Sequence, residues 1–403
     1  MAERVPAQKP RAEVRWFRGP LILPDRVVEN GLVAVSGRRI AGVWDLEREP
    51  APEHPAACTV RVEGFLAPGY IDLHVHGGGG ADFMDGDPEA VATITATHAR
   101  HGTTALLATT LTATEEEILR AIRAVVAAPR RGARILGFHV EGPFVNTNMK
   151  GAQDPRYIRP ADVAEIDRWL AAGGPDYRWH VTLAPEVEGA MAAIQHLVSR
   201  GAVVSAGHTD CTYAQLKAAR DAGLRHVTHL FNGMRGLHHR EPGAVGGALT
   251  LPGLTVEIIA DGVHVHPAVI ALAVQARGPE AVILITDAMR AAGMPDGQYR
   301  LGKLDVTVQS GEARLADGTL AGSVLTMDRA VQNMVRLVGV DLPAAVAMAT
   351  LNPARLHGLE DRKGRLAPGL DADLVLLDRD LNVQATLVEG QVVYDTGVLE
   401  NGG

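Results

Sequence analysis

The chain has 403 residues, of which 46% are hydrophobic and 21% are charged, as is typical of a compact globular protein. Its net charge of −8 argues against nonspecific binding to nucleic acid. No apolar run approaches the length that a bilayer requires, so no membrane span is expected.

The N-terminal segment, residues 1–15, mixes charge with proline and contains no apolar run, so we expect no signal peptide. Two cysteines, Cys58 and Cys211, stand far apart and supply no disulfide framework. Both features favour a reducing, cytoplasmic setting.

The two ends of the chain carry similar β patterns. Residues 32–44 predict a hairpin with its turn at Gly37, and residues 372–394 contain further strand patterns. Neither end is long enough to bury a core alone. We therefore predict that residues 1–66 and 357–403 together form one small β-sandwich domain.

The middle of the chain alternates strand patterns with helical patterns. The strand patterns cover residues 69–76, 103–110, 134–141, 179–185, 202–208, 226–231, 255–260 and 282–286. Such alternation predicts a (β/α)₈ barrel, which we place at residues 67–356, with a β-rich insertion at 297–322. The fold class is thus α/β, a TIM-like barrel with a small terminal sandwich.

Helix-start signals follow three of these strands. Asp87 precedes Pro88, and Thr114 and Thr212 each stand three residues before a Glu or Gln. These are N-cap patterns, and two of them are capping boxes. They support the predicted order of strands and helices.

A histidine pair ends the first predicted strand. Side chains alternate along a strand, so His74 and His76 project on the same face and aim at one point. The glycines that follow allow close approach to the backbone. A lone His-x-His is a weak metal signal, because paired histidines also occur on solvated strands.

Polar residues end several other predicted strands. In a barrel, the active site gathers at the carboxyl ends of the strands. The strand ends supply His139, Glu141, His208, His229, Asp261, His264 and Asp287. Imidazole and carboxylate ligands without a thiolate suit Zn²⁺ or Fe²⁺.

Each of these residues also has a purely structural interpretation. His229 can be a hydrogen-bonded core histidine, and Asp287 can cap a helix. Coincidence at so many strand ends is less plausible, and a carboxylate beside a metal-activated water can transfer its proton to a leaving amine. Asp287 is our candidate for that role, and the set predicts a hydrolase.

Longer motifs carry a family resemblance over nearly the whole chain. They are His74-Val-His76, Glu141-Gly-Pro-Phe144, Gly207-His208-Thr-Asp210, His229-Leu-Phe-Asn-Gly-Met234, His239-Arg-Glu-Pro-Gly243, Ala260-Asp-Gly-Val-His264 and Thr286-Asp-Ala-Met289. In these motifs the sequence resembles the N-acetylglucosamine-6-phosphate deacetylase family of the amidohydrolase superfamily. The resemblance implies hydrolysis of the acetamide of N-acetylglucosamine 6-phosphate, with Asp287 as catalytic acid and base.

The same resemblance implies the metal ligands. Glu141, His208 and His229 match the main ligands of the family. Some members lack the second histidine of His-x-His and hold one metal. Because this chain keeps both His74 and His76, one or two divalent ions, zinc or iron, are implied, the second bridged by Glu141.

Substrate residues are implied by resemblance as well. Asn232, the amide of Gly233, Arg240 and His264 match the phosphate-binding positions. The family arginine can come from a neighbouring subunit, which implies a homodimer. Gln153 stands where the family has a substrate-binding histidine, and glutamine can donate a hydrogen bond but cannot become cationic.

Three alternatives stay open at this point. The same chemistry on N-acetylgalactosamine 6-phosphate is one, and a non-catalytic scaffold on the same fold is another. Enzymes of the dihydroorotase or hydantoinase type form the third, but they need a bridging lysine on the fourth strand. No lysine of this chain lies on a predicted barrel strand.

Overall fold

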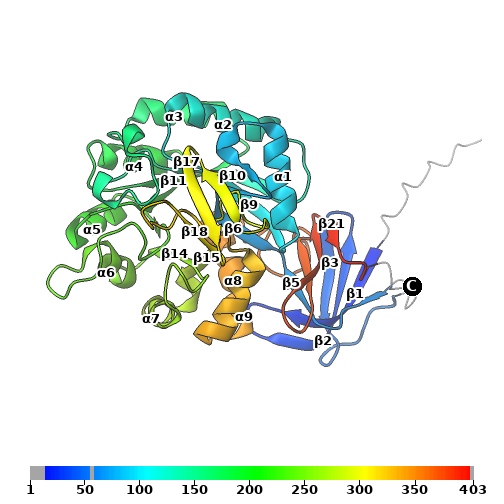
Figure 1. Cartoon of the computed structure of the whole chain (residues 1–403). Coiled ribbons are helices and arrows are strands. Elements are labelled where there is room, and N and C mark those ends of the chain that lie inside the picture. The colour runs from blue at the N-terminus through cyan, green and yellow to red at the C-terminus, as the bar shows by residue number, and fades with distance from the viewer. Residues whose placement is uncertain (1–13, 55–58, 400–403) are drawn as a thin grey trace, which may run out of the picture.

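The computed structural model describes residues 14–54 and 59–399. Cys58 and nearly all of the segment considered for a signal peptide lie outside these residues. No helix in the described ranges is long and apolar enough to cross a membrane. Figure 1 shows a ring of helices around a barrel, with a separate β-sheet at its side that contains both ends of the described chain.

Eight parallel strands form the barrel wall. They are β6 (Tyr70–Val75), β9 (Thr103–Thr110), β10 (Arg134–Glu141), β11 (Arg178–Leu183), β12 (Val203–Ala206), β13 (His226–Val227), β14 (Thr255–Ile259) and β15 (Val282–Ile285), paired in that order. Their side chains are almost all buried, as expected for strands covered on both faces. The predicted (β/α)₈ barrel is confirmed.

Helices cover the outside of the barrel (Figure 1). They are α1 (Pro88–Ala99), α2 (Glu115–Ala127), α3 (Val163–Gly173), α4 (Ala190–Ser199), α5 (Tyr213–Asp221), α6 (Gly243–Thr250), α7 (Pro267–Arg277), α8 (Met327–Asn333), α9 (Leu342–Ala349) and α10 (Leu351–Leu356). The N-caps expected at Asp87, Thr114 and Thr212 are all formed, the last two as capping boxes.

The barrel closes between its first and last strands through a buried side chain. Asp72 in β6 accepts a hydrogen bond from Thr286 Oγ1 at 2.6 Å and another from Thr286 N at 3.2 Å. Beyond it, Val75 pairs with Ala288 in a parallel bridge. Asp72 therefore substitutes for regular ladder bonds at the seam and keeps the ends of β6 and β15 together.

The sixth strand is shorter than the sequence predicts. We expect it to span 226–231, but β13 contains only His226 and Val227. His229 and Phe231 both have left-handed backbone angles, with φ of 29° and 80°, which no strand residue adopts. The apolar run continues as a tight loop, because the chain turns there to aim His229 inward.

The terminal segments form one eight-stranded sheet. It contains β1 (Val14–Ile22), β2 (Val27–Ser36), β3 (Arg39–Asp45), β4 (Thr59–Arg61), β5 (Phe65–Pro68), β19 (Leu374–Leu377), β20 (Val383–Val388) and β21 (Gln391–Asp395). The predicted hairpin with its turn at Gly37 is formed by β2 and β3. β5 pairs with β19, so this sheet joins the two ends of the chain directly before and after the barrel.

A third sheet follows the last barrel strand, in the segment where we predict a β-rich insertion. β16 (Gly297–Leu301), β17 (Leu304–Gln309) and β18 (Glu312–Arg314) pair antiparallel. Their apolar faces pack against Leu111 and Met289, which lie just beyond the ends of β9 and β15. The insertion therefore covers one side of the carboxyl end of the barrel.

A buried histidine fastens α1 to the turn after the first barrel strand. His98 is fully buried, and its Nε2 lies 2.9 Å from the carbonyl oxygen of Gly77. Burial lowers the pKa of His98 to about 4, so the side chain is neutral in the folded protein. Nδ1 has no hydrogen-bond partner among the described residues.

This histidine makes stability sensitive to mild acid. As pH falls below about 6.5, His98 becomes protonated in the unfolded chain, whereas in the folded protein it stays neutral until about pH 4. Between pH 7 and pH 5 this group should cost roughly 2 kcal/mol of folding free energy. His98→Gln keeps a donor to Gly77 but does not titrate, so its urea midpoint should fall less than that of the unmodified protein. Equal losses in both proteins would contradict the prediction.

Candidate active site

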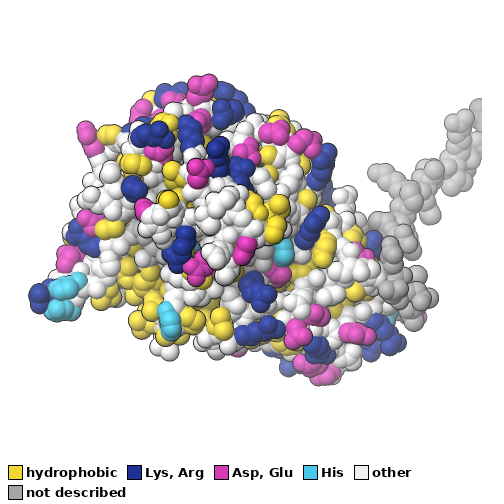
Figure 2. All heavy atoms as spheres, viewed as in Figure 1, with side chains coloured by type: hydrophobic (Ala, Val, Ile, Leu, Met, Phe, Trp, Pro, Cys, Tyr) yellow, Lys and Arg dark blue, Asp and Glu magenta, His cyan; other side chains and the backbone are white. Residues whose placement is uncertain are grey.

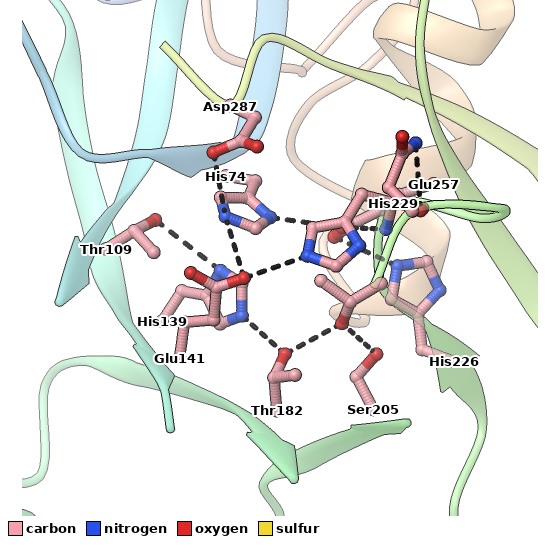
Figure 3. Close-up of polar contacts among 12 residues, drawn as sticks. His74, Thr109, His139, Glu141, Thr182, Ser205, His226, His229, Glu257 and Asp287 are labelled. Carbon is pink, nitrogen blue, oxygen red and sulfur yellow. Dashed lines mark hydrogen bonds and ion pairs between the residues drawn. The ribbon is translucent and has the colours of Figure 1, made fainter. Parts of the chain in front are cut away.

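One buried carboxylate lies at the centre of the candidate site. Glu141 ends β10, and its Oε1 is 3.1 Å from His208 Nε2, 3.0 Å from His229 Nε2 and 3.6 Å from His74 Nε2. Its Oε2 is 3.2 Å from His76 Nε2. The structure thus brings together all five residues that the sequence suggests as metal ligands, and Figure 3 shows three of them, His74, Glu141 and His229.

The imidazoles meet nitrogen to nitrogen. His74 Nε2 lies 3.2 Å from His76 Nε2, and His208 Nε2 lies 3.2 Å from His229 Nε2. Two ring nitrogens at this distance need a proton or another cation between them. His208 Nδ1 faces the carbonyl oxygen of Met149 at 2.9 Å, so it carries the proton and leaves a lone pair on Nε2.

The electrostatics of the site favour a bound cation. Burial alone would lower the pKa of His76, but contacts with Asp287 and Glu141 outweigh it and raise the pKa to about 9. Burial opposes ionisation of Glu141 too, yet His74 and His208 hold its pKa well below the usual range. Both shifts show that this pocket favours positive charge, which a metal ion bound to neutral imidazoles also supplies.

The donor set fits divalent metal ions. Two groups of three ligands, His74-His76-Glu141 and Glu141-His208-His229, each have their ligand atoms within 4.8 Å of one another, and they share Glu141. Imidazole nitrogen with carboxylate oxygen is the combination that zinc and iron accept. The residues can hold one ion in either group, or two bridged by Glu141.

Asp287 borders the ligand group His74-His76-Glu141. Its Oδ1 lies 3.4 Å from His74 Nε2 and 3.2 Å from His76 Nε2. Burial would raise the pKa of Asp287, but the neighbouring His74 and His76 outweigh it and lower the pKa, so the carboxylate is ionised. Its side chain is 13% exposed, against 2% for Glu141, so substrate can reach it more readily.

Three site residues have left-handed backbone angles directly after their strands. The φ values are 47° for His208, 29° for His229 and 50° for Asp287. Such angles are uncommon outside glycine and cluster at functional sites. They turn each side chain across the end of the barrel, toward Glu141.

Gln153 joins the site through the same carboxylate. Its Nε2 donates to Glu141 Oε2 at 2.8 Å, and its Oε1 accepts from the backbone N–H of Thr112 at 2.8 Å. Both ends of this buried amide are therefore engaged. Its contacts orient Glu141, whereas the sequence suggests only a substrate contact for this position.

The expected substrate residues lie on loops around the site. Asn232 and Gly233 follow His229, and the backbone of Gly233 approaches the His208 ring so closely that a Cβ would lie 2.9 Å from Nδ1. Since φ is also +56°, glycine suits this position better than a residue with a side chain. His264 follows β14, with Nδ1 2.6 Å from Asp261 Oδ2.

Arg240 is the expected site residue that stands apart. It lies on an exposed stretch of the loop before α6, where its NH1 lies 2.7 Å from His239 Nε2. That loop projects from the body of the molecule near α6 in Figure 1, and Figure 2 shows basic and histidine side chains at its tip. Within one chain, Arg240 does not contact the residues around Glu141.

Sequence reasoning missed one ionised residue of this region. Glu257 lies in the middle of β14, is fully buried, and reaches His74 Nδ1 with Oε2 at 3.3 Å. Burial opposes ionisation, but His226 and His74 hold its pKa well below the usual range. The detectable signal is an acidic residue inside the otherwise apolar strand Thr255–Ile259.

Comparison with known proteins agrees with this geometry. The model of the amidohydrolase family matches residues 65–393, which is most of the chain. The chain belongs to the amidohydrolase family.

Its relatives narrow the comparison. An N-acetylgalactosamine-6-phosphate deacetylase from Escherichia coli O157:H7 is 44% identical over 341 residues, covering 84% of this chain and 90% of the relative. An N-acetylglucosamine-6-phosphate deacetylase from Bacillus subtilis is 38% identical over 382 residues, covering 93% and 95%. A variant of the N-acetyl-D-glucosamine-6-phosphate deacetylase from Mycobacterium smegmatis, solved with N-acetyl-D-glucosamine 6-phosphate, is 39% identical with a TM-score of 0.87, covering 94% and 99%. These relatives confirm the predicted resemblance.

Glu141 should be indispensable for metal retention. Glu141→Gln removes the charge shared by four imidazoles, so zinc affinity should fall by at least about a hundredfold. Zinc per chain after dialysis measures the effect. Glu188→Gln makes the same change at an exposed glutamate, and that variant should keep its zinc. Full zinc content in Glu141→Gln would rule out Glu141 as a ligand.

Proposed function

We propose that the protein is a metal-dependent hydrolase that converts N-acetyl-D-glucosamine 6-phosphate and water into D-glucosamine 6-phosphate and acetate, in amino-sugar metabolism. The observation that carries the proposal is the convergence of four imidazoles on Glu141, with Asp287 beside them. The named relatives, which match most of the chain, support this substrate.

We propose that Glu141, His208 and His229 hold one metal ion, zinc or iron. His74 and His76 complete a second site that shares Glu141. A divalent ion supplies a Lewis acid, which polarises a carbonyl and lowers the pKa of a water molecule.

Asp287 is the proton-transfer group in this proposal. Its ionised Oδ1 accepts a proton from the attacking water while the water oxygen bonds to the acetamide carbon. The same atom then delivers the proton to the amine nitrogen as the carbon–nitrogen bond breaks. Gln153 holds Glu141 in place through its donated hydrogen bond during these steps.

The phosphate of the substrate is assigned to Asn232, the Gly233 amide, His264 and Arg240. Arginine, an imidazole and a backbone N–H suit a phosphate dianion. Because Arg240 projects away from its own site, we propose a homodimer in which it serves the partner's site. Exposed Leu237, Leu272 and Leu337 are available to an interface, and Figure 2 shows hydrophobic side chains gathered near α7.

The cytoplasm is the proposed location, since the buried Cys211 is a free thiol. No nucleic acid or membrane partner is proposed, and basic and acidic side chains intermingle on the face shown in Figure 2. The N-acetylgalactosamine 6-phosphate reaction is the natural comparison, because one relative bears that name. A scaffold without chemistry is not favoured, since the whole ligand set is present.

Acetate release from three compounds tests the proposal. N-acetylglucosamine 6-phosphate should be hydrolysed with a higher kcat/KM than N-acetylgalactosamine 6-phosphate. The kcat/KM for unphosphorylated N-acetylglucosamine should be at least about a hundredfold lower than for the 6-phosphate, because several charge-assisted contacts to phosphate are lost. Zinc-loaded protein that releases no acetate from any of them would refute the proposal.

Two inactive variants should restore activity when mixed. Asp287→Asn should keep its metal and lose roughly a thousandfold in kcat, and Arg240→Ala should lose substrate affinity. In a mixed dimer, one site receives Asp287 from its own chain and arginine from the partner. Random exchange should recover about a quarter of the unmodified activity.

The mixing experiment needs a check on subunit exchange. Light scattering should give the mass of two chains, and differently tagged chains should co-purify after mixing. If the tagged chains exchange and activity does not return, Arg240 does not act across the interface.

A further inference from the structure

A second buried carboxylate lies one layer below the candidate metal ligands. Glu257 projects from β14 into the barrel interior and is fully buried. Figure 3 shows it on the side of His74 opposite to Glu141. A charge in such a place is costly unless several donors surround it.

Two of the donors that surround Glu257 belong to the predicted metal ligands. Its Oε2 is 3.3 Å from His74 Nδ1 and accepts the backbone N–H of His229 at 3.2 Å. The backbone carbonyl of Glu257 accepts the N–H of Leu230 at 2.9 Å. One residue thus contacts the ligand segments of the first and the sixth barrel strands.

The contact with His74 decides which ring nitrogen carries the proton. A carboxylate only accepts, so His74 Nδ1 is the donor and its Nε2 presents a lone pair toward Glu141 and His76. On the other side, Glu257 Oε1 lies 3.1 Å from His226 Nε2. Thr255 Oγ1, 2.6 Å from His226 Nδ1, can donate there and leave the proton on the nitrogen that faces Glu257.

We propose that Glu257 is a positioning residue for metal binding: it fixes the tautomer and direction of His74 and holds the left-handed backbone at His229. The inference rests on the proposed function only in requiring a metal at the ligands described above. Metal-bound histidines commonly donate their second N–H to such a carboxylate, and its loss typically weakens metal affinity by 10–100-fold.

A different use of the same residue is weaker. His180, His226 and Glu257 form a third group whose ligand atoms lie within 4.8 Å of one another, and neither ring nitrogen of His180 has a hydrogen-bond partner among the described residues. Oε2 of Glu257, however, already lies against His74 Nδ1 and the backbone N–H of His229, so only Oε1 faces this group. We therefore assign Glu257 to the support of the candidate metal ligands around Glu141. Binding of a third ion by His180, His226 and Glu257 is one of the outcomes that the test distinguishes.

The test is zinc affinity of the full-length protein, measured by competition with a chelator, without substrate. Glu257→Gln keeps the size of the side chain but replaces one accepting oxygen by a donor. Zinc affinity should fall by about 10–100-fold. The control is Ser205→Ala, which removes a buried hydroxyl of the barrel interior that bonds to Thr228 and contacts no metal ligand. The zinc affinity of this variant should stay within about twofold of that of the unmodified protein.

A double-mutant cycle separates positioning from general damage. If Glu257 acts chiefly through His74, then Glu257→Gln should have little effect on zinc affinity in a His74→Gln background. An equal fold-loss in both backgrounds would overturn the proposal. Should Glu257→Gln fail to fold, Thr255→Val, which weakens the support of His226, should lower affinity in the same direction, and unchanged affinity would overturn it.

The two proposals fail in different ways. If the protein is an active deacetylase and Glu257→Gln leaves its zinc affinity unchanged, only the positioning role is overturned. Zinc binding that depends on Glu257 in a protein without deacetylase activity overturns the proposed function alone. A third equivalent of zinc that disappears in His226→Gln would assign Glu257 to a separate ion and overturn the positioning role.

Discussion

The charge of Glu141 is the constraint on which the site depends. A carboxylate with 2% exposure at the end of a barrel strand is stable only if its surroundings supply positive charge and hydrogen-bond donors. Here four imidazole nitrogens and the amide of Gln153 surround it. They come from the end of β6 and from the loops after β10, β12 and β13, so the barrel must close correctly before Glu141 is satisfied. The fold and the metal site are therefore coupled through one anion.

The barrel delivers these side chains by departing from regular structure. Strand side chains stand perpendicular to the sheet, whereas a metal site needs them to lean across the open end of the barrel. Left-handed angles at His208, His229 and Asp287 achieve that, at a cost of about 1–3 kcal/mol each. Backbone bonds stabilise them: Asn146 N donates to His208 O, and Asp287 N donates to His74 O. Strain at the site is thus balanced by neighbouring loops.

Periodicity explains what could be predicted. Alternation places His74 and His76 on one face, and parallel strands bring their carboxyl ends to one edge, so the ligand set followed from the strand ends. The length of β13 could not be predicted, because the apolar run through Leu230 is equally compatible with a strand and a buried turn. The hydrogen bond from Gln153 to Glu141 could not be predicted either, because it depends on how the loop after Glu141 folds back.

The position of Glu257 inside the barrel explains why its contact with His74 could not be predicted from the strand ends. Beneath the ligands lies a layer of polar side chains, in which His139 Nε2 bonds to Thr182 (Figure 3). Thr182 in turn bonds to Thr228. An apolar filling would pack as well, but it would leave the Nδ1 proton of His74 without an acceptor. Hydrogen bonds in a buried polar layer are strong, so each of them constrains the two side chains that it joins. The buried polar layer, including Glu257, therefore orients the metal ligands together with Glu141. This layer lies below the strand ends, where the candidate ligands were predicted.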